Sequence, residues 1–504
     1  MMDFTPLARV ALAPKARRAL SAAADCRRVQ LAVLRSLVNK GVKTVYGREH
    51  GLSACSDDLY ADFANALPVS GYEEFRPYAM RMVDGEADVL WPGRVTRFAQ
   101  SSGTSGGKSK FVPITDESLR RNHYAGATAS VALYLHAYPD SRMFAGKGFI
   151  LGGSFANELT LPPGVRVGDL SANLIDGVSP LVNLFRVPSK KVALMEDWSE
   201  KLPALIEASM HEDITNISGV PSWFLTVLKG VVAKAGAQTI CDVWPHLEVF
   251  FHGGIAFGPY REEYAKICSP QMRYWETYNA SEGFFACQSD PSDRAMLLLQ
   301  DAGVFYEFIP LDEIDSPHPT ALPAWEVEKG KTYALCITSC CGLWRYSIGD
   351  TVKIESINPL KITIAGRTQH FINAFGEELM VCNADAAIEK ACRQMGCSIS
   401  NYTAAPVYTE GDNRGRHQWL IEWHQRPADT EAFADLLDSL LQQENSDYQA
   451  KRQGGIFLDR LELLSAAPGL FDHWLSLSGK LGGQRKIPRL SNSRTVIDQL
   501  LAIN

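Results

Sequence analysis

The 504-residue sequence lacks the patterns that mark membrane, secreted and nucleic-acid-binding proteins. No apolar run reaches the roughly 18 residues needed to span a bilayer, and no apolar secretory stretch follows the N-terminus. The 50 basic and 57 acidic residues give a net charge of -7, without a long block of either sign. Because nucleic-acid-binding proteins carry basic patches, we expect neither a membrane nor a nucleic acid as partner. We expect a cytoplasmic protein, and a monomer.

Common metal and catalytic signatures are also missing. The 11 cysteines are an odd number, and Cys340–Cys341, Cys392 and Cys397 fit neither a CxxC redox pair nor a zinc ribbon. A reducing compartment is the simpler interpretation. The 11 histidines contain no HExxH pattern, and no GxSxG elbow occurs. We therefore predict no zinc site of these types.

The N-terminal region allows two interpretations. The segment from Arg9 to Arg35 is rich in arginine and alanine and poor in acids, which is typical of a transit peptide. The pattern "CRRVQLAVLRSLV" within it is also that of an ordinary amphipathic helix. We favour the second interpretation and predict one or two helices over residues 16–48.

The length and the order of patterns predict several domains. A single hydrophobic core stops growing at roughly 250–300 residues, so this chain should form two or more. Predicted strands alternate with helices up to about residue 270, which favours an α/β sheet. The expected elements include a helix in "GYEEFRPYAMRMVDG", a strand, loop and strand in "VTRFAQSSGTSGGKSKFVPIT", and helices over 116–137, 200–210 and 259–268. They also include a strand passing into a helix in "ITNISGVPSWFLTVL" and a strand passing into a glycine loop in "LEVFFHGG".

The pattern changes beyond residue 300. Short strands are expected in "VFYEFIPL", "KTYALCITS", "DTVKIESI" and "KITIAG", as an antiparallel meander or barrel attached to the α/β part. Helices follow near 383–395, 430–444 and 468–479. We place a domain boundary at residues 366–368. The predicted fold class is α/β, with a large N-terminal domain of several subdomains (1–366) and a smaller α+β C-terminal domain (367–504).

The loop "SSGTSGGKSK" (101–110) is rich in hydroxyl groups, backbone N–H groups and lysines. Glycines let the backbone approach phosphate oxygens, while hydroxyl and ammonium groups bind their charge. A flexible Ser/Gly linker would have the same composition. The loop is not a Walker A loop, because "GKS" ends at Ser109 while the first required glycine falls on Ser102.

Two carboxylates stand at strand ends. Glu282, in "YNASEG", could hold Mg²⁺ through one oxygen while phosphates supply others, the usual binding mode of this ion. Asp350, in "YSIGD", could accept both hydroxyls of a ribose. Taken alone, Glu282 is more simply a residue that caps the strand-to-loop transition, and Asp350 is a weak signal because Gly-Asp is also a common turn. Lys486, in "GGQRKIPR", is by itself more consistent with a solvated surface lysine than with catalysis.

The order of these segments carries more information than any one of them. "SSGTSGGKSK", a Gly-Gly turn at 253–254, "YNASE", "YSIGD" and a Gly-Arg pair at 366–367 follow one another along the chain. In this order they resemble the adenylate-forming superfamily, and specifically the Gretchen Hagen auxin-responsive family of acyl acid amido synthetases, here in a bacterial-type version. The resemblance extends from about residue 20 to the C-terminus. One departure is Ser347, where plant members usually have arginine, which puts plant substrate preferences in doubt.

The resemblance implies a set of site residues. The predicted ATP-binding residues are Ser101, Ser102, Gly103, Thr104, Ser105, Lys110, Gly253, Gly254, Thr277, Tyr278, Ser281, Asp350 and Arg367. Glu282 would bind Mg²⁺, and Lys486 would match the family's catalytic lysine. Tyr124, Val220 and Phe224 are candidates for the acyl pocket, although they could equally belong to the core. The C-terminal domain would be mobile, with its hinge at Gly366, Arg367 and Thr368.

The implied activity is adenylation of a carboxylic acid by ATP with Mg²⁺, followed by transfer of the acyl group to an amine or amino acid. Two alternatives stay open. A coenzyme A ligase would share the first half-reaction, and a nucleotide-binding protein without catalysis would perform neither. The sequence names neither the acid nor the amine.

Overall fold

The computed structural model describes residues 2–54, 58–101, 110–157, 159–179, 182–254, 257–314, 316–368, 371–372, 374, 377, 379–408, 415–452, 458–477 and 487–504. The chain forms two compact units. The first comprises Met1–Ile255, Ala265–Ile348 and Val352–Thr363, and the second comprises Ala256–Tyr264, Gly349–Thr351 and Ile364–Asn504. None of the helices in these described ranges combines the length and the apolar character needed to cross a bilayer.

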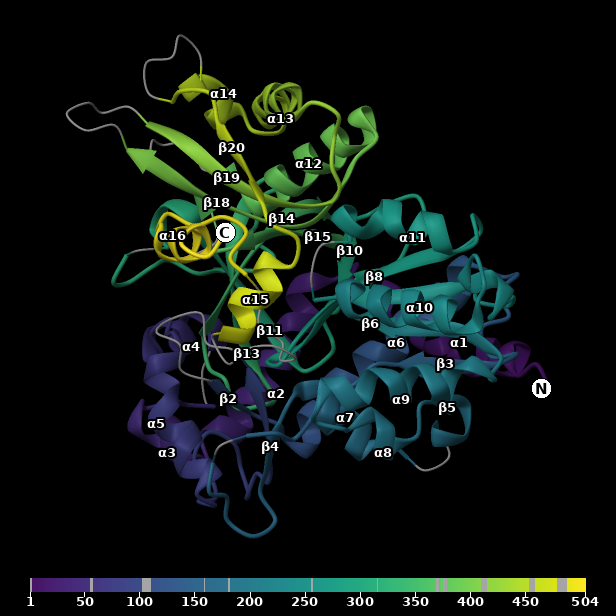
Figure 1. Ribbon diagram of the computed structural model, residues 1–504. Helices are drawn as coiled ribbons and strands as arrows, with labels where there is room; N and C mark the ends of the chain where they lie inside the picture. Colours follow the sequence, from purple (N-terminus) through teal and green to yellow (C-terminus); the bar gives the residue numbers. More distant parts are fainter. Residues whose placement is uncertain are drawn as a thin grey trace. The chain divides into compact units, whose positions relative to one another are not determined.

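A twelve-stranded sheet forms the centre of the first unit, with the order β12-β11-β13-β14-β15-β10-β9-β8-β7-β6-β3-β5 (Figure 1). Its strands are β3 (Lys147–Ile150), β5 (Arg186–Val187), β6 (Ile214–Gly219), β7 (Val249–Gly253), β8 (Arg273–Ala280), β9 (Gly283–Gln288), β10 (Met296–Leu298), β11 (Val304–Pro310), β12 (Leu322–Pro323), β13 (Thr332–Ser339), β14 (Tyr346–Ile357) and β15 (Leu360–Arg367).

Strands β5, β3, β6, β7 and β8 are parallel, and helices cover both of their faces. Val249 and Phe251 of β7 belong to a core cluster with residues of α1 (Thr5–Ala22) and α6 (Tyr124–Ala137). The intervening Phe250 lies 5.4 Å, between ring centroids, from Phe224 of α10 (Pro221–Ala235) on the other face. Because successive strand residues point to opposite faces, a strand covered on both sides must be apolar throughout, as "VFF" is.

The sheet changes direction after β8. The pairs β8–β9, β9–β10, β10–β15, β11–β13 and β11–β12 are all antiparallel. The four strands predicted beyond residue 300 are therefore present as β11, β13, β14 and β15. They continue the same twelve-stranded sheet, because β15 pairs with β10.

The first unit also contains a three-stranded sheet in the order β2-β1-β4, formed by β1 (Arg97–Ser101), β2 (Lys110–Pro113) and β4 (Arg166–Gly168). Its remaining α-helices are α2 (Cys26–Gly41), α3 (Val45–Glu49), α4 (Leu59–Ala66), α5 (Tyr72–Val83), α7 (Leu170–Gly177), α8 (Lys190–Ala193) and α9 (Trp198–Met210). Short helical turns are η1 (Ser118–His123, a π-helix), η2 (Val182–Phe185), η3 (Ile240–Asp242) and η5 (Leu311–Glu313). The turn η4 (Gly258–Tyr260) belongs to the second unit, and α11 (Arg261–Ile267) runs from that unit into the first.

The second unit is built on a three-stranded sheet in the order β18-β19-β20. It consists of β18 (Ser398–Tyr408), β19 (Gly415–Gln425), β20 (Glu462–Ala466), the short pair β16 (Phe371–Ile372) and β17 (Leu379–Met380), and helices α12 (Val381–Met395), α13 (Thr430–Glu444), α14 (Ser446–Arg452), α15 (Leu470–Leu477) and α16 (Thr495–Leu501). Its core joins α12 and α13 to the sheet through fully buried side chains such as Ile388, Leu437 and Trp419.

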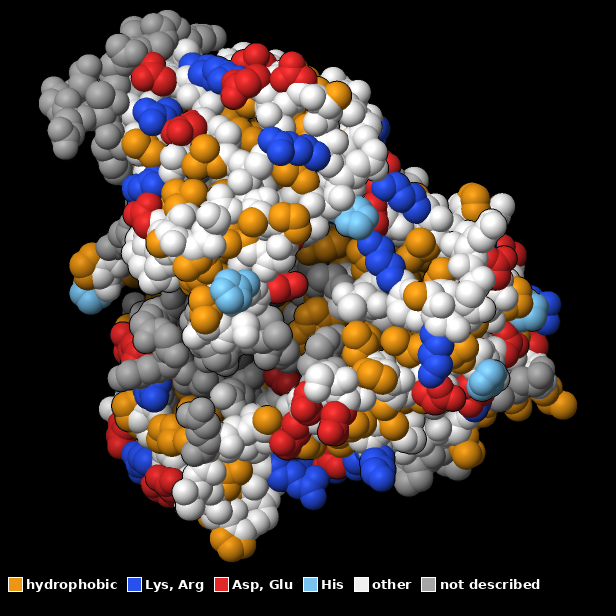
Figure 2. All heavy atoms as spheres, viewed as in Figure 1, with side chains coloured by type: hydrophobic (Ala, Val, Ile, Leu, Met, Phe, Trp, Pro, Cys, Tyr) orange, Lys and Arg blue, Asp and Glu red, His pale blue; other side chains and the backbone are white. Residues whose placement is uncertain are grey.

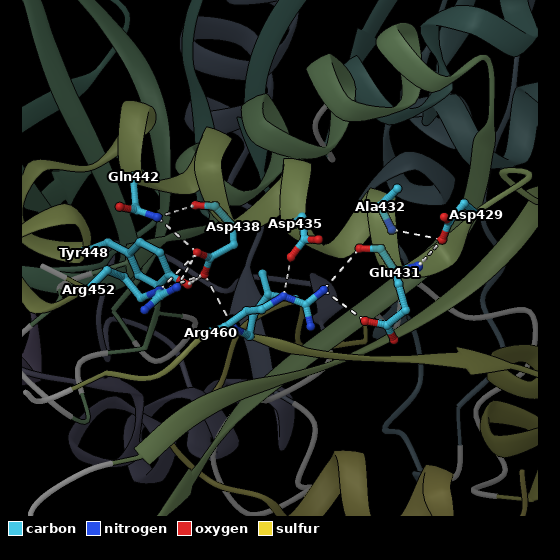
Figure 3. Close-up of polar contacts among 10 residues, drawn as sticks. Asp429, Glu431, Ala432, Asp435, Asp438, Gln442, Tyr448, Arg452 and Arg460 are labelled. Carbon is cyan, nitrogen blue, oxygen red and sulfur yellow. Dashed lines mark hydrogen bonds and ion pairs between the residues drawn. The ribbon is translucent and has the colours of Figure 1, made fainter. Parts of the chain in front are cut away.

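A buried carboxylate ties α13 to α14. Asp438 accepts hydrogen bonds from the Tyr448 hydroxyl at 2.7 Å and from the Arg452 guanidinium at 2.7–3.1 Å (Figure 3). Gln442, one turn later on α13, donates to the same carboxylate at 3.0 Å. A buried charge is tolerated when it is paired and hydrogen-bonded in this way, so the network fixes how α14 packs on α13.

Most of the expected elements are confirmed. The strand, loop and strand around 101–110 are β1 and β2, and "ITNISGVPSWFLTVL" passes from β6 into α10. The predicted helix over 116–137 differs, because its first turn is the π-helix η1. The first helix also begins earlier than expected, at Thr5, and has no strongly apolar stripe to mark its start.

On the face drawn in Figure 2, the described basic and acidic side chains are interspersed.

Candidate functional site

The carboxyl ends of the parallel strands β6, β7 and β8 form one edge of the large sheet. In the register of these strands Gly219 lies opposite His252, and Gly253 lies opposite Thr277. In open α/β sheets ligands bind outside the carboxyl ends of the strands. The predicted ATP-binding residues Gly253 and Thr277 are thus brought side by side at the edge where a ligand is expected.

Two glycines let this edge pack closely. A Cβ atom on Gly253 would lie 2.3 Å from the carbonyl oxygen of Thr277, a distance that no side chain tolerates. Gly254 has a φ of +83°, a conformation that glycine adopts without steric cost. A Cβ there would lie 3.5 Å from the Val220 side chain, which follows β6. The Gly-Gly pair therefore keeps the backbone bare between Thr277 and Val220.

Ser281 and Glu282 form the two-residue turn between β8 and β9. Ala280 pairs with Gly283 across the turn, and the register shifts between Tyr278 and Asn279. Both turn residues are 7% exposed. The backbone carbonyl of Glu282 accepts a hydrogen bond from the Cys341 thiol at 3.7 Å. The backbone that carries the Glu282 carboxylate is therefore buried and hydrogen-bonded, and it lies at the carboxyl end of β8.

The predicted phosphate loop connects the antiparallel strands β1 and β2. Ser101 and Lys110 are cross-strand partners at its two ends. Residues 102–109, with Ser102, Gly103, Thr104 and Ser105, lie outside the described residues, as does the side chain of Ser101. A paired strand on each side nevertheless fixes where the loop begins and ends.

Lys110 lies between two tyrosines. Its ammonium group donates a hydrogen bond of 3.1 Å to the hydroxyl of Tyr346 and lies 5.7 Å from the ring centroids of Tyr346 and Tyr72. Burial is the main cause that raises the pKa of Tyr72 to about 12, and the negative charge of Glu282 adds a smaller contribution. The end of the phosphate loop and the Glu282 turn are therefore within electrostatic range of one phenol.

The backbone before Tyr346 is anchored by a buried ion pair. The guanidinium group of Arg345 bonds the carboxylate of Glu307 at 2.8–3.1 Å and the carbonyl oxygens of Ala64 and Leu67. Glu307 is completely buried and Arg345 is 6% exposed. Because a buried charge without its partner is costly, this pair fixes the start of β14 and with it the ring of Tyr346.

Asp350 lies on β14, among the residues that belong to the second unit, and is 9% exposed. Gly349 before it has a φ of +85°. The carbonyl oxygen of Gly349 accepts a hydrogen bond from the backbone N–H of Thr368 at 2.9 Å. The residue before the predicted ribose ligand is thus hydrogen-bonded to the predicted hinge residue within the second unit.

The three acyl-pocket candidates have different surroundings. Val220 caps the N-terminus of α10 and contacts the Gly254 region. Tyr124 is half-buried, and its hydroxyl donates a hydrogen bond of 2.8 Å to the carbonyl oxygen of Leu174. Phe224 is completely buried and packs against Phe149 and Phe250. Phe224 is therefore placed as a core residue, whereas Val220 lies beside the glycine pair.

Further predicted residues lie outside the described part of the chain. They are Lys486 and, by its side chain, Arg367. Other site neighbours were missed in the sequence, namely Tyr72, Cys341 and the hydroxyl of Tyr346. The only local signal was the tyrosine in "WRYSIGD", because the other two are distant in sequence from the site residues that they contact.

Three sequence models of one family match the chain. They are the GH3 family N-terminal domain over residues 16–180, the GH3 family central domain over 297–367 and the GH3 family C-terminal domain over 382–495. Together they span well over half of the sequence. The predicted site residues at 101–110, 350 and 367 fall inside these matches.

Curated relatives align along almost the whole chain. Indole-3-acetic acid-amido synthetase GH3.8 of Oryza sativa subsp. indica is 22% identical over 94% of this chain and 89% of its own length. Jasmonoyl-L-amino acid synthetase GH3.5 of Oryza sativa subsp. japonica is 24% identical over 95% of each chain. The likeness therefore includes both units.

Solved structures share the fold. The GH3.15 acyl acid amido synthetase has a TM-score of 0.76 at 17% identity, covering 96% of this chain and 94% of its own. A 2-hydroxyisobutyryl-CoA ligase in its postadenylation state has a TM-score of 0.60 at 14% identity, covering 94% and 91%. The predicted fold class, a large α/β unit with a smaller second unit of the adenylate-forming type, is thus confirmed.

Proposed function

The chain belongs to the GH3 family, and on that premise we propose that it is an acyl acid amido synthetase. It forms an acyl-adenylate from a carboxylic acid and ATP and then transfers the acyl group to an amine or amino acid. The relatives described as indole-3-acetic acid-amido and jasmonoyl-amino acid synthetases support this reaction class. Their low identity leaves the acid and the amine of this enzyme open.

One observation carries the proposal beyond family membership. The Ser281–Glu282 turn is buried beside the Gly253–Thr277 edge, and Tyr72 interacts both with the charge of Glu282 and with Lys110 at the end of the phosphate loop. A nucleotide needs such a combination, with bare backbone for close approach, a cation for the phosphates and a carboxylate for the metal. The single carboxylate of Glu282 fits Mg²⁺, because this ion prefers oxygen ligands and usually binds one or two protein carboxylates together with phosphate oxygens.

In the first half-reaction an oxygen of the substrate carboxylate bonds to the α-phosphorus of ATP. The bond from that phosphorus to the oxygen bridging to the β-phosphate breaks, so pyrophosphate leaves with the bridging oxygen. Ser101, Ser102, Thr104, Ser105 and Lys110 hold the phosphates, and Lys486 offsets charge that develops on the α-phosphate. Mg²⁺, when bound at Glu282, supplies further neutralisation of phosphate charge. The protein contributes position and electrostatics.

In the second half-reaction the amine nitrogen bonds to the acyl carbon. The bond from that carbon to the phosphate oxygen breaks, AMP leaves, and the nitrogen loses a proton to solvent. We propose that residues 367–504 rotate between the two steps about Gly366, Arg367 and Thr368, with residues 1–366 as the fixed part. The change of compact unit at Ile364 supports this boundary. Such closure also keeps water from the reactive anhydride.

The acyl group is assigned to the space beside Val220, which contacts the Gly254 region. Tyr124, which follows the π-helix η1, is the second candidate for this pocket. Ser347, in place of the arginine usual in plant members, argues against carrying over plant substrate preferences. We further propose a cytoplasmic monomer, in keeping with cysteines that lack disulfide-type spacing. Sedimentation analysis tests the oligomeric state.

A screen of carboxylic acids by pyrophosphate release, repeated with each amino acid, tests the function. Pyrophosphate should form from ATP only with a suitable acid, and an amide with AMP should form when the amine is added. Release of orthophosphate would contradict adenylation. A thioester formed with coenzyme A, in place of an amide, would identify a coenzyme A ligase. The absence of acid-dependent pyrophosphate exchange would leave a non-catalytic nucleotide-binding protein.

A further inference from the structure

The π-helical turn η1 sets one buried asparagine against the strand that follows the Glu282 turn. Regular helices rarely contain such turns, and those that occur are frequent at functional sites. Asn122 lies in this turn and is 1% exposed. Its side chain points away from its own helix, since all three of its hydrogen bonds go to backbone groups more than 160 residues away.

Asn122 holds both backbone groups of a single residue. Its side-chain oxygen accepts a hydrogen bond of 2.7 Å from the N–H of Phe284, and its amide nitrogen donates to the carbonyl oxygen of Phe284 at 3.0 Å. The amide nitrogen also donates to the carbonyl oxygen of Ala302 at 2.9 Å. Phe284 is the second residue of β9, two positions after Glu282. The side chain of Asn122 thus takes the place of a strand partner next to the turn.

The surrounding packing leaves little freedom at this point. A Cβ atom on Gly126, one turn beyond Asn122 in α6, would lie 2.6 Å from the ring of Phe284. A Cβ atom on Gly283 would lie 3.1 Å from the side-chain oxygen of Asn122. The helix and the strand are therefore in direct contact, and the position of Phe284 follows that of Asn122.

The turn needs such support because its own ladder is irregular. The β8–β9 register shifts between Tyr278 and Asn279, directly before the turn. On the other side, the Cys341 thiol contacts the carbonyl oxygen of Glu282 and lies 2.8 Å from the Ser339 hydroxyl. Asn122 is the stronger of the two supports, because amide hydrogen bonds of 2.7–3.0 Å are better than a weak thiol bond of 3.7 Å.

We propose that Asn122 is a positioning residue for Mg²⁺ binding, acting on the Glu282 carboxylate through the backbone of Phe284. The inference rests on the proposed function, in which Glu282 binds Mg²⁺. When a group that orients a metal ligand is removed, metal affinity or activity commonly falls by about 10- to 100-fold.

Asn122→Asp is the most specific test. The aspartate keeps an acceptor for the N–H of Phe284 but removes the donor to Phe284 and Ala302. Gln30→Glu is a matched control, since Gln30 is also fully buried, accepts one backbone N–H and donates to two backbone carbonyls. Its partners are Gln300, Val304 and Tyr306, which flank Ala302 in the sequence but do not include Phe284. Both substitutions therefore remove contacts to residues 300–306, and only Asn122→Asp also removes the contact to Phe284 beside the turn.

We expect Asn122→Asp to raise the Mg²⁺ concentration needed for half-maximal pyrophosphate release by about tenfold or more, within the range for residues that orient metal ligands. Binding of Mn²⁺ to the ATP complex, followed by electron paramagnetic resonance, should weaken in parallel. In metal-free protein, amide exchange in a peptide covering 281–288 should become faster. Gln30→Glu should change none of these three measurements, whatever its effect on stability.

A double mutant separates positioning from general damage. If Asn122 acts through Glu282, then adding Asn122→Asp to Glu282→Gln should cost little further, because the two changes remove one function. Additive losses, or equal effects of Asn122→Asp and Gln30→Glu on the Mg²⁺ requirement, would overturn the inference. If Asn122→Asp does not fold, Asn122→Ser retains a short polar group and replaces it in the comparison with Gln30→Glu and in the double mutant. A wild-type protein without acid-dependent pyrophosphate release would instead refute the proposed function.

Discussion

The ammonium group of Lys110 donates a hydrogen bond of 3.1 Å to the hydroxyl of Tyr346, which is 236 residues further along the chain. Tyr72 contributes a second aromatic ring at 5.7 Å from the same ammonium group. Cations are attracted to the faces of aromatic rings, so the two phenols hold the ammonium group in place. They do so at the residue where the predicted phosphate loop rejoins the sheet.

Lys110→Met should therefore reduce the rate of adenylation by about 100-fold, the usual cost of losing one oriented donor to developing charge. Tyr346→Phe, which removes only the hydroxyl, should give a smaller loss of the same kind. Pyrophosphate release under saturating ATP measures both. The surface variant Lys353→Met is the control. A wild-type rate in Lys110→Met would show that this lysine does not contact the phosphates.

Asp350→Ala should weaken ATP binding about tenfold or more, since a charge-assisted hydrogen bond contributes roughly 1.5–3 kcal/mol. The physical reason is that an ionised carboxylate can accept both ribose hydroxyls. Calorimetric titration with ATP measures the change, and Asp312→Ala, at an exposed position, is the control. Unchanged affinity would show that Asp350 does not bind the ribose.

Lys486→Ala should lose most of the adenylation rate, about 100- to 1000-fold, while ATP binds almost normally. Charge develops on the α-phosphate in the transition state, where a preorganised cation has its greatest effect. Single-turnover adenylation and ATP titration separate the two quantities. Lys480→Ala should be mild, and equal behaviour of the two variants, or unfolding of Lys486→Ala, would refute the catalytic assignment.

Thr368→Pro should impair one half-reaction more than the other, because proline fixes φ near -65° at the proposed hinge. It also removes the N–H that bonds Gly349. Thr368→Ala keeps this N–H and is therefore the control. Adenylation and amide formation from preformed adenylate are measured separately. Equal losses in both would argue against rotation at this residue.

Acidification should destabilise the first unit through His123. Burial lowers the pKa of His123 to about 4, below the ordinary value of about 6.5. Between these two values the unfolded chain binds a proton that the folded chain does not. The free energy of unfolding should therefore fall by about 1.4 kcal/mol per pH unit as the pH decreases from 6.5 to 4, and be unaffected by this group above 6.5.

Urea unfolding at several pH values, followed by probes in the first unit, measures this slope. In His123→Gln the dependence of the unfolding free energy on pH should decrease by about 1.4 kcal/mol per pH unit, the contribution of one proton. His318→Gln, at an exposed position, should leave it unchanged. An identical pH dependence in wild type and His123→Gln would show that His123 is not the group that titrates.

The sequence predicted the parts of the fold that depend on local pattern. The fully apolar "VFF" of β7 and the glycine pair after it identified a buried strand and its loop, and Ser281–Glu282 was expected at a strand end. The strand, loop and strand around 101–110 followed from β-branched and aromatic residues on both sides of a glycine cluster. The spacing of apolar residues and the position of turn-forming residues are enough to predict such elements.

Contacts between distant segments could not be predicted in this way. Nothing near Lys110 indicates that Tyr346 and Tyr72 will surround it, and nothing near Asn122 indicates that Phe284 will be its partner. These pairs form only when the sheets and helices pack together. The π-helical turn at 118–123 was also missed, because its residues have an ordinary helical pattern and their conformation is set by tertiary contacts.

The insertion of β15 between β10 and β14 determines when this protein can fold during its synthesis. The ribosome completes α1 and α2 first, yet the amide of Gln30 on α2 finds its partners only at residues 300–306. The ladder that closes the sheet needs Leu360–Arg367, more than 300 residues later. Contacts so far apart in sequence form slowly, and exposed strands invite aggregation meanwhile. Fragments that end before residue 360 should therefore depend on chaperones, and the first unit should become protease-resistant only once β15 has left the ribosome.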